Sequence, residues 1–389
     1  MTFGPYVNEE FEINFYSTYH FQLSTFNFLT NLYIMFSLFQ KSPFKPFALW
    51  LLTGAVLVYV MVVVGSITRL THSGLSITDW SVMGSLPPLS EESWQEYFQK
   101  YQQSPEYKYK NFGMSLEEFK SIFWWEYIHR FIGRLIGVVF IVGFLILHFK
   151  KQIPSGFYKK MGVLFLLGAL QGIIGWWMVK SGLVDKPAVS HYRLATHLLN
   201  AFLVFGFTFW YLLDVLYYNH RYETSKNEQV YFKWVVIFFV ILILQIMYGA
   251  FVAGLKAGLF YNTWPKMGTE WFPSDTILIY DNVIKNFLDV PAGVQFMHRM
   301  LAYLVVILMI VLWYLSSKYK LRDNQQRAIS WVIYFVTIQF MLGIFTLLYQ
   351  VPIVLGVLHQ TVAFFLYATC IYLIFLLKRK NTFSESTTI

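Results

Sequence analysis

Long apolar stretches alternate with short polar segments along most of the chain. A helix of about 20 apolar residues is long enough to cross the hydrocarbon core of a bilayer. Eight stretches reach roughly that length, at residues 47–68, 125–148, 161–180, 191–217, 232–255, 294–315, 328–349 and 353–377. The pattern therefore predicts an all-α integral membrane protein with eight transmembrane helices.

The composition agrees with a membrane protein. Of the 389 residues, 57% are hydrophobic and only 13% are charged, whereas about a quarter of the residues in a soluble domain are charged. A net charge of +9 at pH 7 would suggest a nucleic-acid partner for a soluble chain, but Lys and Arg also collect in the cytoplasmic loops of membrane proteins. We therefore expect the lipid bilayer and no nucleic acid as a partner. The single cysteine, Cys370, excludes an internal disulfide and a Cys-rich metal site.

The segments between the predicted spans alternate in charge. Lys and Arg gather in every second segment, near residues 41–45, 150–160, 221–233, 318–327 and 378–380. This side is the cytoplasm, or the matrix in an organelle. The long segment 69–124 and the segment 256–292 have balanced charges and are expected outside. Both termini then lie in the cytoplasm.

Residues 1–46 precede the first predicted span and form a cytoplasmic or interfacial extension in this interpretation. Their apolar run FNFLTNLYIMFSLF is too short to span with certainty. Glu9, Glu10 and Glu12 argue against a secretory signal or an Arg-rich transit peptide. Translation from Met35 is an alternative, because a short cytoplasmic tail would then lead into the first span.

The second half of the chain repeats the first. Residues of the first copy that recur in order are Gly65, Gly74, Leu75, Trp80, Met83, Gly84, His129, Arg130, Gln171, Gly175 and His197; their counterparts are Gly249, Gly258, Leu259, Trp264, Met267, Gly268, His298, Arg299, Gln339, Gly343 and His359. Each copy holds four spans, so both insert in the same orientation. We expect two tandem pseudo-symmetric four-helix bundles, at 47–218 and 234–378, joined by a linker at 219–233 and followed by a tail at 379–389.

Four of the nine histidines lie inside spans and are matched by the repeat: His129, His197, His298 and His359. Each lies within about two turns of the outer end of its span, roughly 10 Å deep at 1.5 Å per residue. A lone membrane histidine is usually hydrogen-bonded to a neighbouring helix. Four at one level, in two equivalent pairs, instead favour axial ligation of haem iron inside a four-helix core. Zinc would need a further ligand in each bundle.

The other histidines are weaker candidates. His72 lies in the outer segment close to the predicted haem level, where it either supports the site or is a solvated loop residue. His191 has no partner in the repeat, and His148 and His220 lie at inner ends.

The two copies differ beside the first histidine of each pair. Glu126 precedes His129 by three residues, whereas Gln295 stands at that place before His298. A carboxyl at membrane depth is a functional candidate by default; the alternative is a salt bridge to a nearby arginine. Further charged groups are confined to the first copy, since Arg69 and Arg134 are matched by Ala253 and Tyr303. The first half therefore carries the groups suited to chemistry.

Three segments together with the repeated histidines resemble haem A synthase of the proteobacterial and mitochondrial type. They are GSITRLTHSGLSITDW, LPPLSEESWQEYFQKYQQSPEYK and GMSLEEFKSIFWWEYIHRFIGR. The resemblance covers about residues 47–378. The paired extracellular cysteines of the other branch of that family are absent, so no thiol redox role is carried over.

The resemblance implies a membrane oxidoreductase that converts haem O into haem A for terminal oxidases. Successive hydroxylations would turn the methyl group at C8 of the porphyrin into a formyl group. His298 and His359 would ligate a permanent haem b, while His129 and His197 would frame the haem O substrate. Glu126 would lie near the reacting edge, where it moves protons or stabilises positive charge. Arg130 and Arg299 are expected to pair with haem propionates or with acids of the outer loops, and Arg69 and Arg134 are supporting candidates.

The resemblance also implies a haem O synthase as a partner, an unidentified electron donor, and the plasma membrane of a bacterium rather than the mitochondrial inner membrane. Self-association stays open. Two alternatives come from other classes: a bis-histidine membrane cytochrome b that carries electrons, and a haem transporter or chaperone. Glu126 separates them from the synthase, because electron transfer needs no acid beside a haem ligand.

Overall fold

The computed structural model describes residues 37–79, 84, 86–183, 188–218 and 224–378. Several sequence predictions fall outside these ranges: the first 36 residues of the extension, the tail, the linker residues 219–223 with His220, and the repeat residues Trp80 and Met83. Within the described ranges the regular structure is helical, and eight helices are long and apolar enough to cross a membrane. The predicted all-α class and eight spans are confirmed.

The eight long helices divide equally between the two copies of the repeat. The first copy contains α2 (Lys45–Leu70), α5 (Leu116–Phe149), α6 (Tyr158–Lys180) and α7 (His191–Leu216). The second contains α8 (Lys226–Gly254), α11 (Pro291–Lys318), α12 (Asp323–Leu348) and α13 (Ile353–Lys378). Most ends agree with the sequence prediction within a few residues. The start of α5 does not, since the apolar pattern predicted a start at residue 125.

The early start of α5 has a local cause. Ser115 accepts a hydrogen bond from the backbone of Glu118, and the Glu118 carboxylate accepts one from the backbone of Ser115. This capping box satisfies donors at the helix end that would otherwise lack a partner. The first turns of α5 are therefore helical outside the apolar window, and they support the outer segment of the first half.

The outer segment packs on this extension of α5. Its helices are α3 (Glu91–Gln102) and α4 (Pro105–Tyr109). The Trp94 ring centroid lies 5.0 Å from that of Phe123, and Tyr101 stacks on Phe119 at 5.0 Å. The outer segment of the second half has only the short helices η2 (Ala257–Leu259), α9 (Ser274–Ile277) and α10 (Val283–Leu288).

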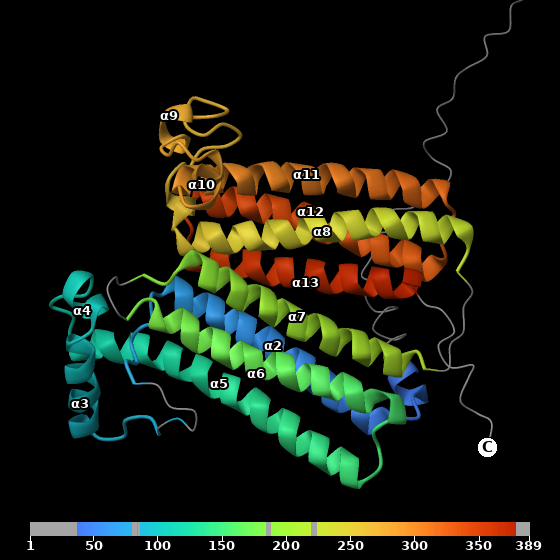
Figure 1. Cartoon of the computed structure of the whole chain (residues 1–389), viewed down its shortest axis with the longest axis horizontal. Coiled ribbons are helices and arrows are strands. Elements are labelled where there is room, and N and C mark those ends of the chain that lie inside the picture. Colours follow the sequence, from blue (N-terminus) through green and yellow to red (C-terminus); the bar gives the residue numbers. More distant parts are fainter. Residues whose placement is uncertain (1–36, 80–83, 85, 184–187, 219–223, 379–389) are drawn as a thin grey trace, which may run out of the picture.

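The two groups of four helices lie side by side (Figure 1). In the second half, α11 packs on α8 and α12 packs on α13, and α11 also packs along α12. In the first half, α5 packs on α2 and α6 packs on α7, but α5 and α6 scarcely contact each other. Figure 1 shows α5 diverging from the other helices of its bundle. The first bundle is therefore the more open of the two.

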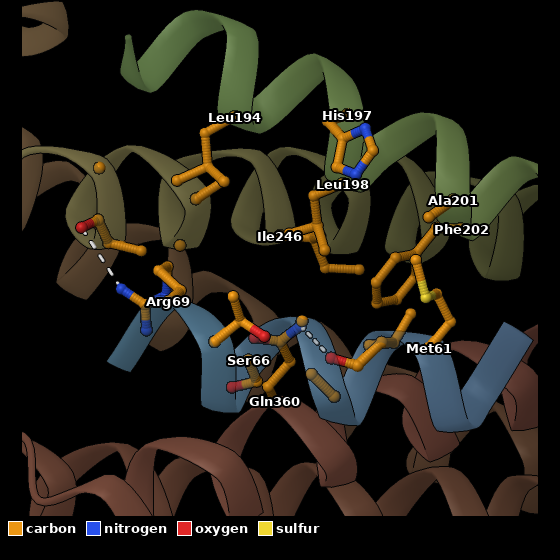
Figure 2. Close-up of a pocket in the computed structure, with 18 of the residues that line it drawn as sticks. Met61, Ser66, Arg69, Leu194, His197, Leu198, Ala201, Phe202, Ile246 and Gln360 are labelled. Carbon is orange, nitrogen blue, oxygen red and sulfur yellow. Dashed lines mark hydrogen bonds between the residues drawn. The ribbon is translucent and has the colours of Figure 1, made fainter. Parts of the chain in front are cut away.

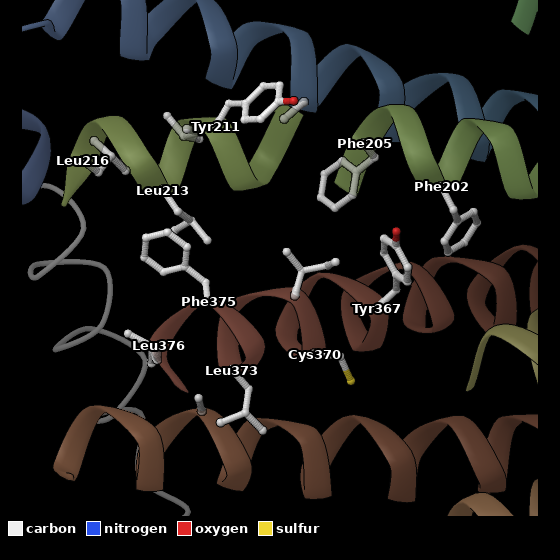
Figure 3. Close-up of a cluster of buried hydrophobic side chains, with 14 of the residues drawn as sticks. Phe202, Phe205, Tyr211, Leu213, Leu216, Tyr367, Cys370, Leu373, Phe375 and Leu376 are labelled. Atoms are coloured by element: carbon white, nitrogen blue, oxygen red, sulfur yellow. The ribbon is translucent and has the colours of Figure 1, made fainter. Parts of the chain in front are cut away.

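Helices α2 and α7 of the first half pack on α8 and α13 of the second half, with α7 against α8 and α13 and with α2 against α13. The side-chain amide of Gln360 on α13 donates to the carbonyl oxygen of Val62 on α2 at 3.4 Å (Figure 2). Aromatic and aliphatic side chains of α7 and α13 face each other along the remaining contact (Figure 3). Gly206 allows the close approach, because a Cβ there would lie 2.5 Å from the Tyr367 hydroxyl oxygen. Cys370 is buried in this cluster. Close packing of this kind stabilises helix association where lipid offers no hydrophobic driving force.

Candidate functional site

A single cavity of about 1540 Å³ extends through both halves. All four repeat-matched histidines line it, and the His197 ring points into it from α7 (Figure 2). The other sequence candidates line it too: Glu126, Arg69, His72, Arg130, Arg134 and Arg299. The fold therefore brings together the four repeat-matched histidines, Glu126 and the five supporting candidates, whereas the weaker candidates His148 and His191 do not line the cavity.

Each of the four repeat-matched histidines lies against a glycine of a neighbouring helix. A Cβ built on that glycine would lie only 3.0–3.3 Å from the nearest ring atom, which is closer than side chains normally pack. The four pairs are Gly65 with His129, Gly175 with His197, Gly249 with His298 and Gly343 with His359. Glycine thus leaves room for each imidazole ring, and the repeat-related histidines share the same contact.

Three of the four histidines also contact a glutamine. The amide nitrogens of Gln171, Gln245 and Gln339 lie 3.4, 3.4 and 3.2 Å from the Nε2 atoms of His197, His298 and His359, respectively. The Nδ1 atoms of the same three rings are buried without a partner. At His129 the pattern changes, because Met61 stands four residues before Gly65 where Gln245 stands before Gly249. A thioether cannot donate the hydrogen bond that an amide donates.

Glu126 has every acceptor position of its carboxylate occupied. One oxygen accepts from Nε and Nη2 of Arg130 at 3.0 and 2.6 Å. The other accepts from the Ser76 hydroxyl at 2.7 Å and the Ile77 backbone N–H at 2.8 Å. An ionised carboxylate offers about four acceptor sites. Glu126 therefore forms a salt bridge with Arg130, as the alternative interpretation expected. Its hydrogen bonds with Ser76 and Ile77 also hold the outer segment against α5.

The second half has an uncharged version of this arrangement. Gln295 donates to the Tyr261 carbonyl at 3.1 Å, and Arg299 donates to the Tyr261 and Lys266 carbonyls at 2.9 and 3.2 Å. Arg130 likewise donates to the carbonyls of Ile77 and Asp79, at 2.8 Å each. Both arginines thus anchor an outer segment. The buried Nε of Arg299 has no partner, whereas Arg130 uses Nε and both Nη atoms.

The remaining three candidates lie at the outer end of the first half. Arg69 donates to the Ala253 carbonyl of α8 at 3.4 Å (Figure 2), so it contacts the residue that replaces it in the repeat. The Arg134 guanidinium lies against Gly84 of the outer segment. Burial lowers the pKa of His72, and the nearby charges of Lys256, Lys110 and Arg69 lower it further. His72 is therefore neutral at pH 7.

Comparison with known proteins identifies the family. The family of cytochrome oxidase assembly proteins named COX15-CtaA matches residues 48–371. This chain belongs to that family. Relatives include a protein of Flavobacterium johnsoniae named heme A synthase, 45% identical over 338 residues, which are 86% of this chain and 98% of the relative. Proteins of the same name from Nitrosospira multiformis and Wolbachia pipientis wMel are 42% and 40% identical over 337 and 344 residues, covering 86% and 87% of this chain and 94% of each relative.

The cavity of this COX15-CtaA family member suits a flat macrocycle better than a bare metal ion. Among the described residues, no three His, Cys, Asp or Glu side chains gather as they would around a metal ion. The four repeat-matched histidines instead line one cavity, each with a glycine beside its ring. Three of the rings have an Nδ1 atom without a partner, and the cavity around them is large and mostly apolar. These features suit an iron-containing macrocycle as the ligand.

The sequence did not single out some of the residues that contact these histidines or line the cavity. Gln171 and Gln339 were visible as repeat partners, but their spacing gave no sign of a contact to histidine. Gln245 is matched by Met61, so the repeat concealed it. Glu106 lies on α4 within one of the segments that carry the resemblance, but the repeat matches no residue to it and the sequence did not single it out as a cavity residue.

Proposed function

We propose that this protein is a haem A synthase, a membrane oxidoreductase that converts haem O into haem A. The family match and the names of relatives that align over nearly their full length support this activity. The observation that carries it within the chain is a difference in charge beside the two repeat-related histidines His129 and His298. Glu126 adds a buried carboxylate beside His129, whereas Gln295 is neutral beside His298.

In this proposal the second half holds a permanent haem b and the first half holds the substrate. His298 and His359 ligate haem b, and His129 and His197 hold haem O. The openness of the first bundle supports the division, since a substrate must enter and leave. Gly137, Gly168 and Gly172 of α5 and α6 line the cavity, are exposed, and have no other atom within 4 Å of a Cβ position. A path between α5 and α6 would let a lipophilic haem exchange with the bilayer.

The bound haems supply the iron and oxygen chemistry and the electron path. The protein binds and orients the substrate through His129 and His197. Glu126 provides a fixed negative charge, which stabilises positive charge that develops at the methyl carbon. The four hydrogen bonds that Glu126 accepts leave no free acceptor site on its carboxylate. Of the two roles expected from the sequence, we therefore propose charge stabilisation and not proton transfer. Arg299 contributes its free Nε to a propionate, whereas the donors of Arg130 are already used.

The protein is a multi-pass membrane protein by its eight apolar helices. We place it in the plasma membrane of a bacterium with both termini in the cytoplasm, on the basis of the charge alternation. A cysteine at Glu92 should then react with a membrane-impermeant thiol reagent in intact cells, while a cysteine at Lys151 should not. The native Cys370 is 1% exposed and gives little background. The reverse labelling pattern would show that the protein has the opposite orientation in the membrane. Haem O synthase and an electron donor remain the expected partners.

The activity is tested by the pigments of cells that make haem O but have no other haem A synthase. Cells that express this chain should accumulate haem A or its hydroxylated precursor, measured by chromatography of extracted haems. Unchanged haem O with a bound haem spectrum would support the electron-carrying cytochrome b instead.

A further inference from the structure

The cavity contains a second buried carboxyl that the mechanism above does not use. Glu106 lies on α4 in the outer segment, and it is 3% exposed. Glu106 and Glu126 are the two acidic side chains among the described residues that line the cavity. Glu106 lies outside the membrane-spanning helices, so it is closer to the outer solution than Glu126.

The surroundings of Glu106 differ from those of Glu126 in one decisive respect. Glu106 accepts a single long hydrogen bond, from the Tyr101 hydroxyl at 3.4 Å, and that hydroxyl itself accepts from the Asn111 amide at 2.7 Å. Glu126 accepts four hydrogen bonds, two of them from a guanidinium. A carboxylate with free acceptor sites can bind a proton without losing a hydrogen bond, whereas every acceptor site of Glu126 is occupied. Glu106 is therefore the carboxyl of this cavity that is free to change its protonation state.

The charged groups around Glu106 set the pH at which it titrates. Burial raises the pKa of Glu106 to about 7. The positive charges of Lys110 and Lys256 lower it, the negative charge of Glu126 raises it, and the hydrogen bond from Tyr101 lowers it. Lys110 is exposed, so the group is near outer water as well as the cavity. At neutral pH Glu106 thus exchanges between acid and carboxylate.

We propose that Glu106 carries protons between the outer solution and the cavity during the oxidation of the substrate. This inference rests on the proposed haem A synthase activity. In the first hydroxylation a methyl group, dioxygen, two protons and two electrons from the donor become a hydroxymethyl group and one water. In the second, the hydroxymethyl group consumes the same reactants and becomes a geminal diol and one water, and the diol then loses water to give the formyl group. The largely apolar cavity must therefore take up protons. Glu106 binds a proton from outer water, releases it into the cavity and returns to the carboxylate.

Infrared difference spectroscopy of the purified protein without haem O tests the protonation itself. The wild type should show the carbonyl band of a protonated carboxylic acid that disappears as the pH rises through about 7. Glu106→Gln should lack this band, because Gln keeps an acceptor for Tyr101 but cannot titrate. Glu126→Gln and the exposed control Glu92→Gln should retain it. The same titrating band in Glu106→Gln would overturn the proposal.

The second experiment measures haem A formed per haem-b-loaded protein as a function of pH. Since the acid form delivers the proton, the wild-type rate should fall above pH 7. Glu106→Gln should be slower by roughly tenfold to a hundredfold, the usual effect of a proton-transfer group, with that fall abolished. Glu106→Asp should restore part of the rate, and Glu92→Gln should match the wild type.

Different results would refute the role of Glu106 and the synthase activity. A wild-type rate and pH profile in Glu106→Gln would refute the role of Glu106 while leaving the synthase in place. A wild type that forms no haem A would refute the proposed function and this inference with it. An unchanged haem b spectrum in each variant establishes that the fold is intact.

Discussion

At the scale of single residues, the site depends on contacts so close that an added methyl group would require the neighbouring ring to shift. Gly343 lies beside His359 so closely that a Cβ would be 3.1 Å from the ring carbon Cε1. Both residues are inside helices, where the backbone cannot easily move away. The position of the imidazole, and hence of any group it ligates, is therefore set by the size of its neighbour.

Gly343→Ala should displace the His359 ring and lower the amount of haem b bound per protein severalfold. Alanine favours the helix over glycine by about 1 kcal/mol, so a loss of haem cannot be assigned to a weaker helix. Gly162→Ala on α6 is the matched control, because no atom lies within 4 Å of its Cβ position. The measurement is the absorbance of haem b relative to protein. Equal loading of the two variants would contradict the packing argument.

Glu126→Gln should lower both the yield of folded protein and the haem A formed per folded molecule. It removes the counter-charge of Arg130, whose side chain is only 14% exposed, and breaking a buried pair costs about 3–5 kcal/mol. The second-half haem b should remain, because Gln is the native residue at position 295. Glu228→Gln is the control, since it breaks the buried pair with Arg322 (N–O distance 2.8 Å) away from the cavity. Near-normal turnover per haem-b-loaded Glu126→Gln protein would leave Glu126 a purely structural role.

At the scale of elements, the clearest difference between the two halves is that α5 and α6 scarcely contact each other. The equivalent pair α11 and α12 packs together. The sequence predicted both pairs as equivalent spans, because hydropathy records how apolar a helix is and not which neighbour it touches. It also missed the outer turns of α5, since Glu117, Glu118 and Lys120 interrupt the apolar pattern while the capping box of Ser115 extends the helix.

Gly172→Leu should slow the uptake of haem O by purified protein while leaving haem b content unchanged. A leucine there would occupy the space between α5 and α6 that borders the cavity. Gly162→Leu on the same helix is the control, because it is also exposed and unobstructed but does not line the cavity. The measurement is the rate of the spectral change on adding haem O. Equal rates for both variants would exclude this path.

At the scale of the whole molecule, the four histidines share one cavity because the two bundles pack along α7 and α13. The repeat made the pairing of the histidines predictable, since matched residues in tandem copies take matched positions. It could not predict contacts that exist once only. Glu126 accepts hydrogen bonds from Ser76 and Ile77, whereas the neutral Gln295 donates to Tyr261. Glu106 lines the cavity from α4, which belongs to the longer outer segment of the first half.

The central claim is the division of labour between the halves, and haem analysis of four histidine variants tests it most directly. Each of His129, His197, His298 and His359 is changed to alanine, and bound haem b and haem A formation are measured on purified protein. His298→Ala and His359→Ala should lose haem b, because one of its two axial ligands is gone. His129→Ala and His197→Ala should retain haem b with its spectrum unaltered and form little or no haem A. Loss of haem b from the first-half variants, with retention in the second-half variants, would contradict the account.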